Sequence, residues 1–174
     1  INDDFALQYD RFIINYFDWD IKRAKEYAEV FKFIEERVKP EREKFKPINS
    51  WNKFVREYYW LFGAYRVGLN EALINKKYCF VTSVVTKYLN FTLADTNFVF
   101  SNAVYIYANN SFSDYAFLQC SIHNEWIRRY CSSLESRLRY TTTDGFETFP
   151  FPQNLNHLQE QQLESLGKAY HEHR

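Results

Sequence analysis

Apolar residues recur at helical spacing in three segments of the chain, and each segment predicts an amphipathic helix. The first covers residues 21–38, where an aspartate at position 18 or 20 can cap the start and Pro40 ends the helix. The second covers residues 113–130, and the third covers residues 155–173. The expected apolar stripes are Ile21, Ala24, Tyr27 or Ala28, Phe31, Ile34 and Val38; Phe117 or Leu118, Ile122, Trp126 and Tyr130; and Leu155, Leu158, Leu163, Leu166 and Tyr170.

Between the first and second helices, the pattern changes to short β-branched and aromatic runs that lack a helical period. Turn residues separate these runs, which is typical of antiparallel strands. The expected strands are 78–85, 89–93, 98–100 and 103–107, with a possible further strand at 11–17, short helices at 51–58 and 69–74, and a charged connector at 39–50. The fold class is therefore α+β: a small, mostly antiparallel sheet flanked by helices, with a helical N-terminal linker and a C-terminal helix.

The composition is that of a folded protein but does not choose a function. The chain has 174 residues, of which 46% are hydrophobic and 20% aromatic, and it has only 4 glycines. This length suits one domain with helical appendages, and the aromatic content argues against disorder. The aromatic side chains can serve equally as core or as a stacking surface.

The net charge of zero counts against a stand-alone nucleic-acid-binding protein, which is usually basic. The positive charge is nevertheless concentrated near the end of the chain. Between residues 126 and 140 there are four arginines and a single acidic residue, namely Arg128, Arg129, Arg137, Arg139 and Glu135. We therefore expect one positively charged face on an otherwise neutral protein.

The three cysteines form no Cys-x-x-Cys pair, which fits a reduced, cytoplasmic protein rather than a disulfide framework. No apolar run is long enough for a membrane span, so no membrane partner is expected. The chain begins with Ile-Asn-Asp-Asp and ends in a helix whose apolar side needs a partner. Both features indicate a piece of a longer polypeptide.

The charged residues that follow the second helix alternate along the chain. In an extended strand Glu135, Arg137 and Arg139 share one face, with Ser136 and Leu138 turned inward. Arginine can donate two hydrogen bonds to guanine, and glutamate can accept one from the cytosine amino group, so such a row can read a G·C pair. The alternative is an ordinary solvated run of charges, and the spacing alone favours this alternative.

Catalytic signatures are absent from the sequence. His123-Asn124-Glu125 matches half of a zinc deaminase motif, but the Pro-Cys-x-x-Cys half is missing. Phosphate-binding glycine loops and Gly-x-Ser-x-Gly turns are also missing. The buried-strand pattern around Cys79 predicts a core residue rather than a nucleophile. We expect no metal site, and His123 fits an ordinary histidine on a helix surface.

Several blocks of the sequence together resemble one known family. They are Phe17-Asp18; Glu36-Arg37-Val38-Lys39-Pro40-Glu41-Arg42; Tyr59-Trp60-Leu61-Phe62-Gly63 with Arg66; Ser121-Ile122-His123 with Trp126; Leu138-Arg139-Tyr140 with Asp144 and Phe146; Phe149-Pro150-Phe151-Pro152; and Gly167 with Tyr170 and His171 to Arg174. The chain resembles the target-recognition region of MmeI-type restriction-modification enzymes, which join a nuclease, an adenine-N6 methyltransferase and a DNA-reading domain in one polypeptide.

The resemblance implies specific roles in binding double-stranded DNA. Glu135 and Arg137 fall where the family places a pair that reads one base pair, and Arg139 falls on a further reading position. Asn102 and Ala103, at the break between two expected strands, match a third. We expect phosphate contacts from Arg128, Arg129 and Lys87. The resemblance thus favours the functional interpretation of the alternating charges.

The resemblance also implies a domain order. Residues 1–50 would be a linker after a methyltransferase domain, 51–152 the recognition domain, and 153–174 the start of a C-terminal helical domain. The methyltransferase motif Asn-Pro-Pro-Tyr is absent from the sequence. S-adenosylmethionine would therefore bind the parent enzyme rather than this segment, and the isolated segment would bind DNA weakly and with strong salt dependence.

Two other functions remain open at this point. The aromatic and leucine surfaces suit a protein-interaction module of a larger enzyme without base recognition. A free-standing hydrolase that uses His123 and Glu125 is the last alternative.

Overall fold

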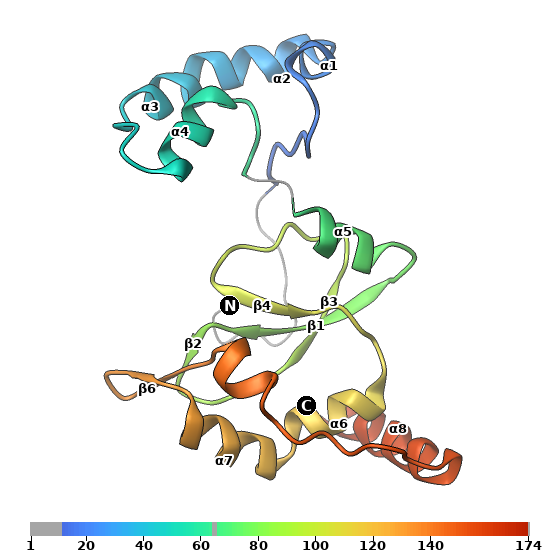
Figure 1. The fold of residues 1–174 in the computed structure, drawn as a ribbon. Helices are drawn as coiled ribbons and strands as arrows, with labels where there is room; N and C mark the ends of the chain where they lie inside the picture. Colours follow the sequence, from blue (N-terminus) through green and yellow to red (C-terminus); the bar gives the residue numbers. More distant parts are fainter. Residues whose placement is uncertain (1–11, 64–65, 174) are drawn as a thin grey trace. The chain divides into compact units, whose positions relative to one another are not determined.

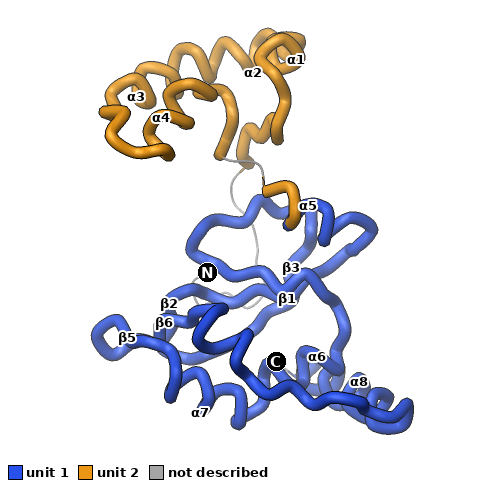
Figure 2. The backbone as a smooth tube through the Cα atoms, viewed as in Figure 1, with its two compact units in different colours: residues 1–8, 69–174 blue, residues 9–68 orange. Residues whose placement is uncertain are grey.

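The computed structural model describes residues 12–63 and 66–173. The chain forms two compact units, and the division falls between Gly68 and Leu69. Figure 2 shows them in two colours. We call the unit that ends at Gly68 the helical unit, and the one that begins at Leu69 the mixed unit. Within the described residues no helix is both long and apolar enough to cross a membrane.

The helical unit is built from short consecutive helices around an aromatic core (Figure 1). Its elements are α1 (Ile21–Lys25), α2 (Ala28–Phe33), the π-helical turn η1 (Ile34–Val38), α3 (Lys39–Glu43) and α4 (Ser50–Glu57). The Asp20 side chain accepts from the Arg23 amide and caps α1, as expected. The predicted stripe is confirmed where Ala24, Phe31 and Ile34 are buried.

Two expectations for the helical unit are wrong. Residues 12–17 form no strand, and Arg11 lies outside the described residues. The first helical region also continues through Pro40 to the end of α3, so the connector is shorter than expected. Pro40 is tolerated because the π-helical turn ends just before it, with the Lys39 amide bonded to the Ile34 carbonyl. Proline then stands in the first turn of α3, where an amide has no partner to lose.

The mixed unit combines two small antiparallel sheets with helices, which confirms the α+β fold class. One sheet has the strand order β3-β1-β4 and the other has the order β2-β6-β5. The strands are β1 (Tyr78–Ser83), β2 (Val85–Thr86), β3 (Thr92–Asp95), β4 (Val104–Tyr107), β5 (Ser133–Leu134) and β6 (Arg137–Arg139). Residues 98–100 form no strand. Instead, Phe98 and Phe100 pack against the buried side chains of β1.

The central strand β1 is covered on both faces. Phe80 lies in a core with Tyr115 and Leu118 of the helix that follows β4. On the other face Cys79 and Val81 pack near Leu73 from α5 (Val67–Leu73), among other residues. Cys79 is fully buried, and burial raises the pKa of its thiol to about 11, which confirms that it is a core residue. The sheet therefore forms a fixed support between helices (Figure 1).

The predicted helix at 113–130 is two helices, α6 (Phe112–Gln119) and α7 (Ser121–Tyr130). Cys120 has an extended backbone, ends α6, and caps α7 by accepting from the His123 amide. This break shifts the phase of α7. Its buried residues are His123 and Ile127, whereas Ile122 and Tyr130 of the predicted stripe are 70% and 53% exposed.

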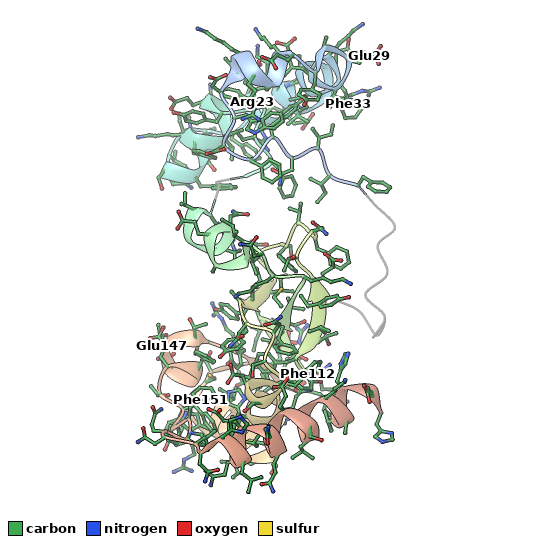
Figure 3. All side chains as sticks on the ribbon, turned by 90° about the vertical axis from the view of Figure 1, so that its right-hand side faces the viewer. Arg23, Glu29, Phe33, Phe112, Glu147 and Phe151 are labelled. Carbon is green, nitrogen blue, oxygen red and sulfur yellow. The ribbon has the colours of Figure 1, made fainter. Side chains whose placement is uncertain are left out.

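The last helix, α8 (His157–Glu172), packs against α6 at a close crossing. Asn156 and Gln159 form a capping box at its start. Gly167 is buried against the backbone of Phe112, the first residue of α6. Figure 3 labels Phe112. Glu164 accepts from the Ser113 amide and so satisfies a free amide of α6. Leu158 and Leu166 stay exposed, so two residues of the predicted apolar stripe do not take part in the packing of this helix.

This contact predicts the effect of Gly167→Ala. An added Cβ would lie 1.9 Å from the Phe112 carbonyl oxygen, so α8 must move away from α6. We expect the free energy of unfolding to fall by about 1–3 kcal/mol. Chemical denaturation measures the change. Gln162→Ala also places an alanine in α8, but at an exposed position, and should change stability little. Equal stability of the two variants would contradict the close crossing.

Candidate nucleic-acid interface

The alternating charged residues lie on a tight β-hairpin. Leu134 of β5 pairs with Arg137 of β6, so Glu135 and Ser136 form a two-residue turn. Glu135 has a φ of 57°, a left-handed conformation that is unfavourable for most side chains. In the strand itself Leu138 is buried, whereas Arg137 and Arg139 are exposed on the opposite face.

The hairpin confirms part of the predicted row and corrects the rest. Arg137 and Arg139 share one exposed face, as expected. Glu135 does not belong to the strand, and Ser136 is exposed rather than turned inward. The turn arises without glycine, asparagine or aspartate at its two central positions, so the sequence carries no turn signal there. Glu135 reaches Arg137 from the turn instead of standing beside it along an extended strand.

Glu135 and Arg137 form an ion pair at the tip of the hairpin. Arg137 Nη2 donates to Glu135 Oε2 at 2.8 Å, and both side chains remain largely exposed to solvent. An exposed pair of this kind contributes little to stability. It orients the two groups, while the bond occupies only one of the five N–H donors of the guanidinium. The pair is thus arranged as a donor and an acceptor side by side.

A backbone link through Val84 brings a distant segment to this hairpin. The Val84 amide donates to the Ala103 carbonyl, and the Val84 carbonyl accepts from the Tyr140 amide, each at 2.9 Å. Val84 lies between β1 and β2, so it joins the two sheets. Neighbouring strands lie about 4.8 Å apart, which places the Asn102–Ala103 turn about 10 Å from the end of β6. The structure therefore brings these residues, far apart in sequence, onto adjoining segments.

Asn102 and Ala103 themselves lie in a turn just before β4, and both are exposed. They do not mark a break between strands at 98–100 and 103–107 as expected, because residues 98–100 form no strand. The hydroxyl of Ser101 accepts from the Ala103 amide and holds the turn. The side chain of Asn102 is thus carried by a turn that is fixed to the sheet through its neighbour.

The three residues expected at phosphates are exposed but differ in position. Lys87 follows β2, whose Thr86 pairs with Leu138, so its backbone lies beside the start of β6. Arg128 and Arg129 are in the last turn of α7. Arg128 Nε donates to Asn124 Oδ1 at 2.8 Å, whereas Arg129 lines a shallow groove with Ile122, Trp126 and Tyr130. The two arginines therefore face different directions.

His123 is buried beneath this region and is not a surface residue, which corrects the sequence prediction. Its Nδ1 bonds to the Leu118 carbonyl at 2.8 Å, and the ring packs near Tyr140 and Phe149. Nε2 is buried without a hydrogen-bond partner among the described residues. Glu125 is exposed on another face of α7, so the two side chains cannot act together as the hydrolase alternative requires.

Comparison with known proteins identifies the family. The model of the family described as "MmeI, target recognition domain" matches residues 2–153. This chain belongs to that family. The MmeI target recognition domain model thus covers the hairpin, the Val84 link and the Asn102–Ala103 turn within a single match.

A solved structure supports the same fold. The type IIL restriction-modification enzyme MmeI in complex with DNA matches with a TM-score of 0.64 and 21% sequence identity. The match covers 87% of this chain and 19% of that chain, so this target recognition domain spans about a fifth of its relative's length. A search of curated proteins gives no match.

The left-handed conformation at Glu135 predicts how substitutions there affect stability. We expect Glu135→Val to unfold more easily than Glu135→Gly by about 1–2 kcal/mol, because a β-branched residue is strained at positive φ. Both variants lack the carboxylate, so their difference isolates the backbone. The same two substitutions at Ser136, which has no positive φ, should not show this order. Chemical denaturation compares the four proteins.

Burial of His123 predicts a pH dependence. Desolvation lowers the pKa of the imidazole below its usual 6.5, so below this pH the unfolded chain binds a proton that the folded chain excludes. Stability is present in full above pH 6.5 and falls as the pH drops, by up to about 1.4 kcal/mol per pH unit. His123→Asn should remove this contribution, and the exposed His157→Asn should keep it. Equal slopes in both variants would contradict the assignment.

Proposed function

We propose that this domain recognises a specific sequence of double-stranded DNA for a larger restriction-modification enzyme, and that the β5–β6 hairpin carries base-reading residues. One observation supports the proposal most. The Val84 link joins the hairpin to the Asn102–Ala103 turn, so the candidate readers come from adjoining segments of a fixed sheet. Membership of the MmeI target recognition domain family agrees with it.

The hairpin has the size and chemistry to enter a major groove. This groove is about 12 Å wide and admits a two-stranded β-ribbon. Arg137 presents a guanidinium that can donate to guanine O6 and N7, while the Glu135 carboxylate can accept from the cytosine amino group. Because the two groups lie side by side, they suit the two bases of one G·C pair. Arg139, two residues along the same face, would read a further base pair.

The Asn102–Ala103 turn would supply a third contact. An asparagine amide can pair with adenine N6 and N7, and a small alanine leaves room for a base edge beside it. Arg128, Arg129 and Lys87 would position the domain by phosphate contacts, which carry no sequence information. With zero net charge, the domain alone would bind DNA weakly and more weakly still as salt rises.

Catalysis in this proposal belongs to other domains of the enzyme. An upstream methyltransferase domain would bind S-adenosylmethionine and transfer a methyl group to adenine N6. The residues of this chain would orient the DNA so that the target adenine reaches that domain after it leaves the base stack. The similarity to the MmeI enzyme in its DNA complex covers only 19% of that chain, which agrees with a catalytic part outside this domain.

Exchange of the pair tests the proposal. In the enzyme that carries this domain, the double change Glu135→Lys and Arg137→Asp swaps the donor and the acceptor. The preferred base pair should then change at one position of the methylated sequence, because each base now meets the opposite group. Sequencing of methylated sites from a random DNA library measures this.

Arg128→Gln is the control for the exchange. Loss of a phosphate contact should weaken binding to all sequences alike and leave the preferred site unchanged. Loss of activity in the double variant with an unaltered preference among residual products would reject the assignment of the pair. A domain whose substitutions never alter sequence preference would instead be a protein-interaction module, for which the exposed Ile122 and Tyr130 on α7 supply a surface.

A further inference from the structure

Leu134 is a large apolar residue on the face of the hairpin that carries the arginines. It pairs directly with Arg137, and directly opposed residues of antiparallel strands place their side chains on the same face. Its side chain is 48% exposed, whereas Leu138, on the other face, is 6% exposed. The hairpin therefore turns one leucine into the core and another toward solvent, beside the ion pair.

The surroundings of Leu134 are polar, which makes the exposed leucine informative. Glu135 follows it at the turn, and Arg137 stands across from it. About half of the Leu134 surface stays in contact with water, and this exposed half gains nothing from the hydrophobic effect in the unbound hairpin. In a major groove the same group would meet base edges, and the apolar feature of those edges is the 5-methyl group of thymine.

We propose that Leu134 is a specificity-determining residue that contacts the 5-methyl group of a thymine in the base pair next to the one read by Glu135 and Arg137. This inference rests on the proposed function. Side chains of directly opposed strand residues lie about 5 Å apart, and successive base pairs lie about 3.4 Å apart along the DNA axis. With Arg137 on one base pair, Leu134 reaches the adjacent base pair.

The arrangement gives the hairpin two kinds of recognition at neighbouring positions. Hydrogen bonds from Arg137 and to Glu135 distinguish G·C from the other pairs. Contact with Leu134 distinguishes thymine from cytosine at the next pair by its methyl group. Uracil has the same hydrogen-bonding groups as thymine but lacks that methyl group. A difference in affinity between thymine and uracil duplexes therefore measures the apolar contact with the methyl group and not a hydrogen bond.

The experiment uses the enzyme that carries this domain, together with DNA, and has three steps. Duplexes bound from a random pool at low salt are sequenced to define the preferred site. Arg137→Gln then identifies the base pair whose preference is lost. Finally, each thymine in the site is replaced by uracil in turn, and binding is measured by fluorescence anisotropy for the unchanged enzyme, for Leu134→Ala and for Leu134→Val.

We expect uracil at the adjacent base pair to weaken binding of the unchanged enzyme about fourfold, the effect of one buried methyl group. Leu134→Ala should bind the thymine and uracil duplexes equally, and Leu134→Val should fall between. Leu158→Ala removes a similarly exposed leucine from α8 and should keep the full thymine preference. All variants are checked for unchanged thermal unfolding, which the exposure of position 134 leads us to expect.

The outcomes separate the two proposals. A preferred site without an adjacent thymine, or a thymine preference that survives in Leu134→Ala, overturns the role of Leu134 and leaves the function of the domain intact. A pool that shows no sequence preference overturns the proposed function itself. A thymine preference lost in Leu134→Ala alone supports both.

Discussion

The arrangement of the candidate site depends on the two backbone hydrogen bonds of Val84. Its amide is bonded to the segment that leads into β4, and its carbonyl is bonded to the end of β6. Through these two bonds Val84 connects the backbone of one three-stranded sheet to that of the other, and the two sheets also share one hydrophobic core. The hairpin and the Asn102–Ala103 turn are thus parts of one framework that is supported by β1 and by the aromatic core around Phe80.

Because the link uses only backbone atoms, it is independent of the side chains that it brings together. Arg139 stands next to Tyr140, yet one side chain faces solvent and the other is fully packed in the core. His123 of α7 packs against Tyr140, the residue that directly follows β6, and so supports the end of this strand from the core. The exposed surface of the hairpin can therefore carry a range of charges while the buried surface keeps its position.

The sequence predicts the types of elements better than their junctions. The strands at β1 and β4 and the terminal helix follow from composition and periodicity, because packing and propensity agree there. The break at Cys120 escapes prediction, since no glycine or proline marks it and apolar residues continue across it. As a result, the positions predicted to be buried in α7 are shifted by one residue from those that are buried. The π-helical turn before Pro40 is missed for the same reason, because its extra residue leaves no signal in the pattern.

For the candidate site, spacing alone finds Arg137 and Arg139 but places Glu135 in the wrong conformation. A two-residue turn with an ordinary glutamate in a left-handed conformation is set by the pairing of β5 with β6, not by local preference. The proximity of Asn102 is also out of reach of sequence spacing, because it depends on a backbone contact between residues that are distant along the chain. Only the family resemblance points to it.

Alternate residues of β6 and of the position after it belong to different environments, with Leu138 and Tyr140 inside and Arg137 and Arg139 outside. A single-residue insertion or deletion in this strand would exchange the two sets and put guanidinium groups into the core. Length variation should thus be tolerated in the loop after β3, ahead of the Asn102–Ala103 turn that Val84 holds in place. It should be excluded from the hairpin, where only side-chain replacement keeps the two sets of residues in their environments.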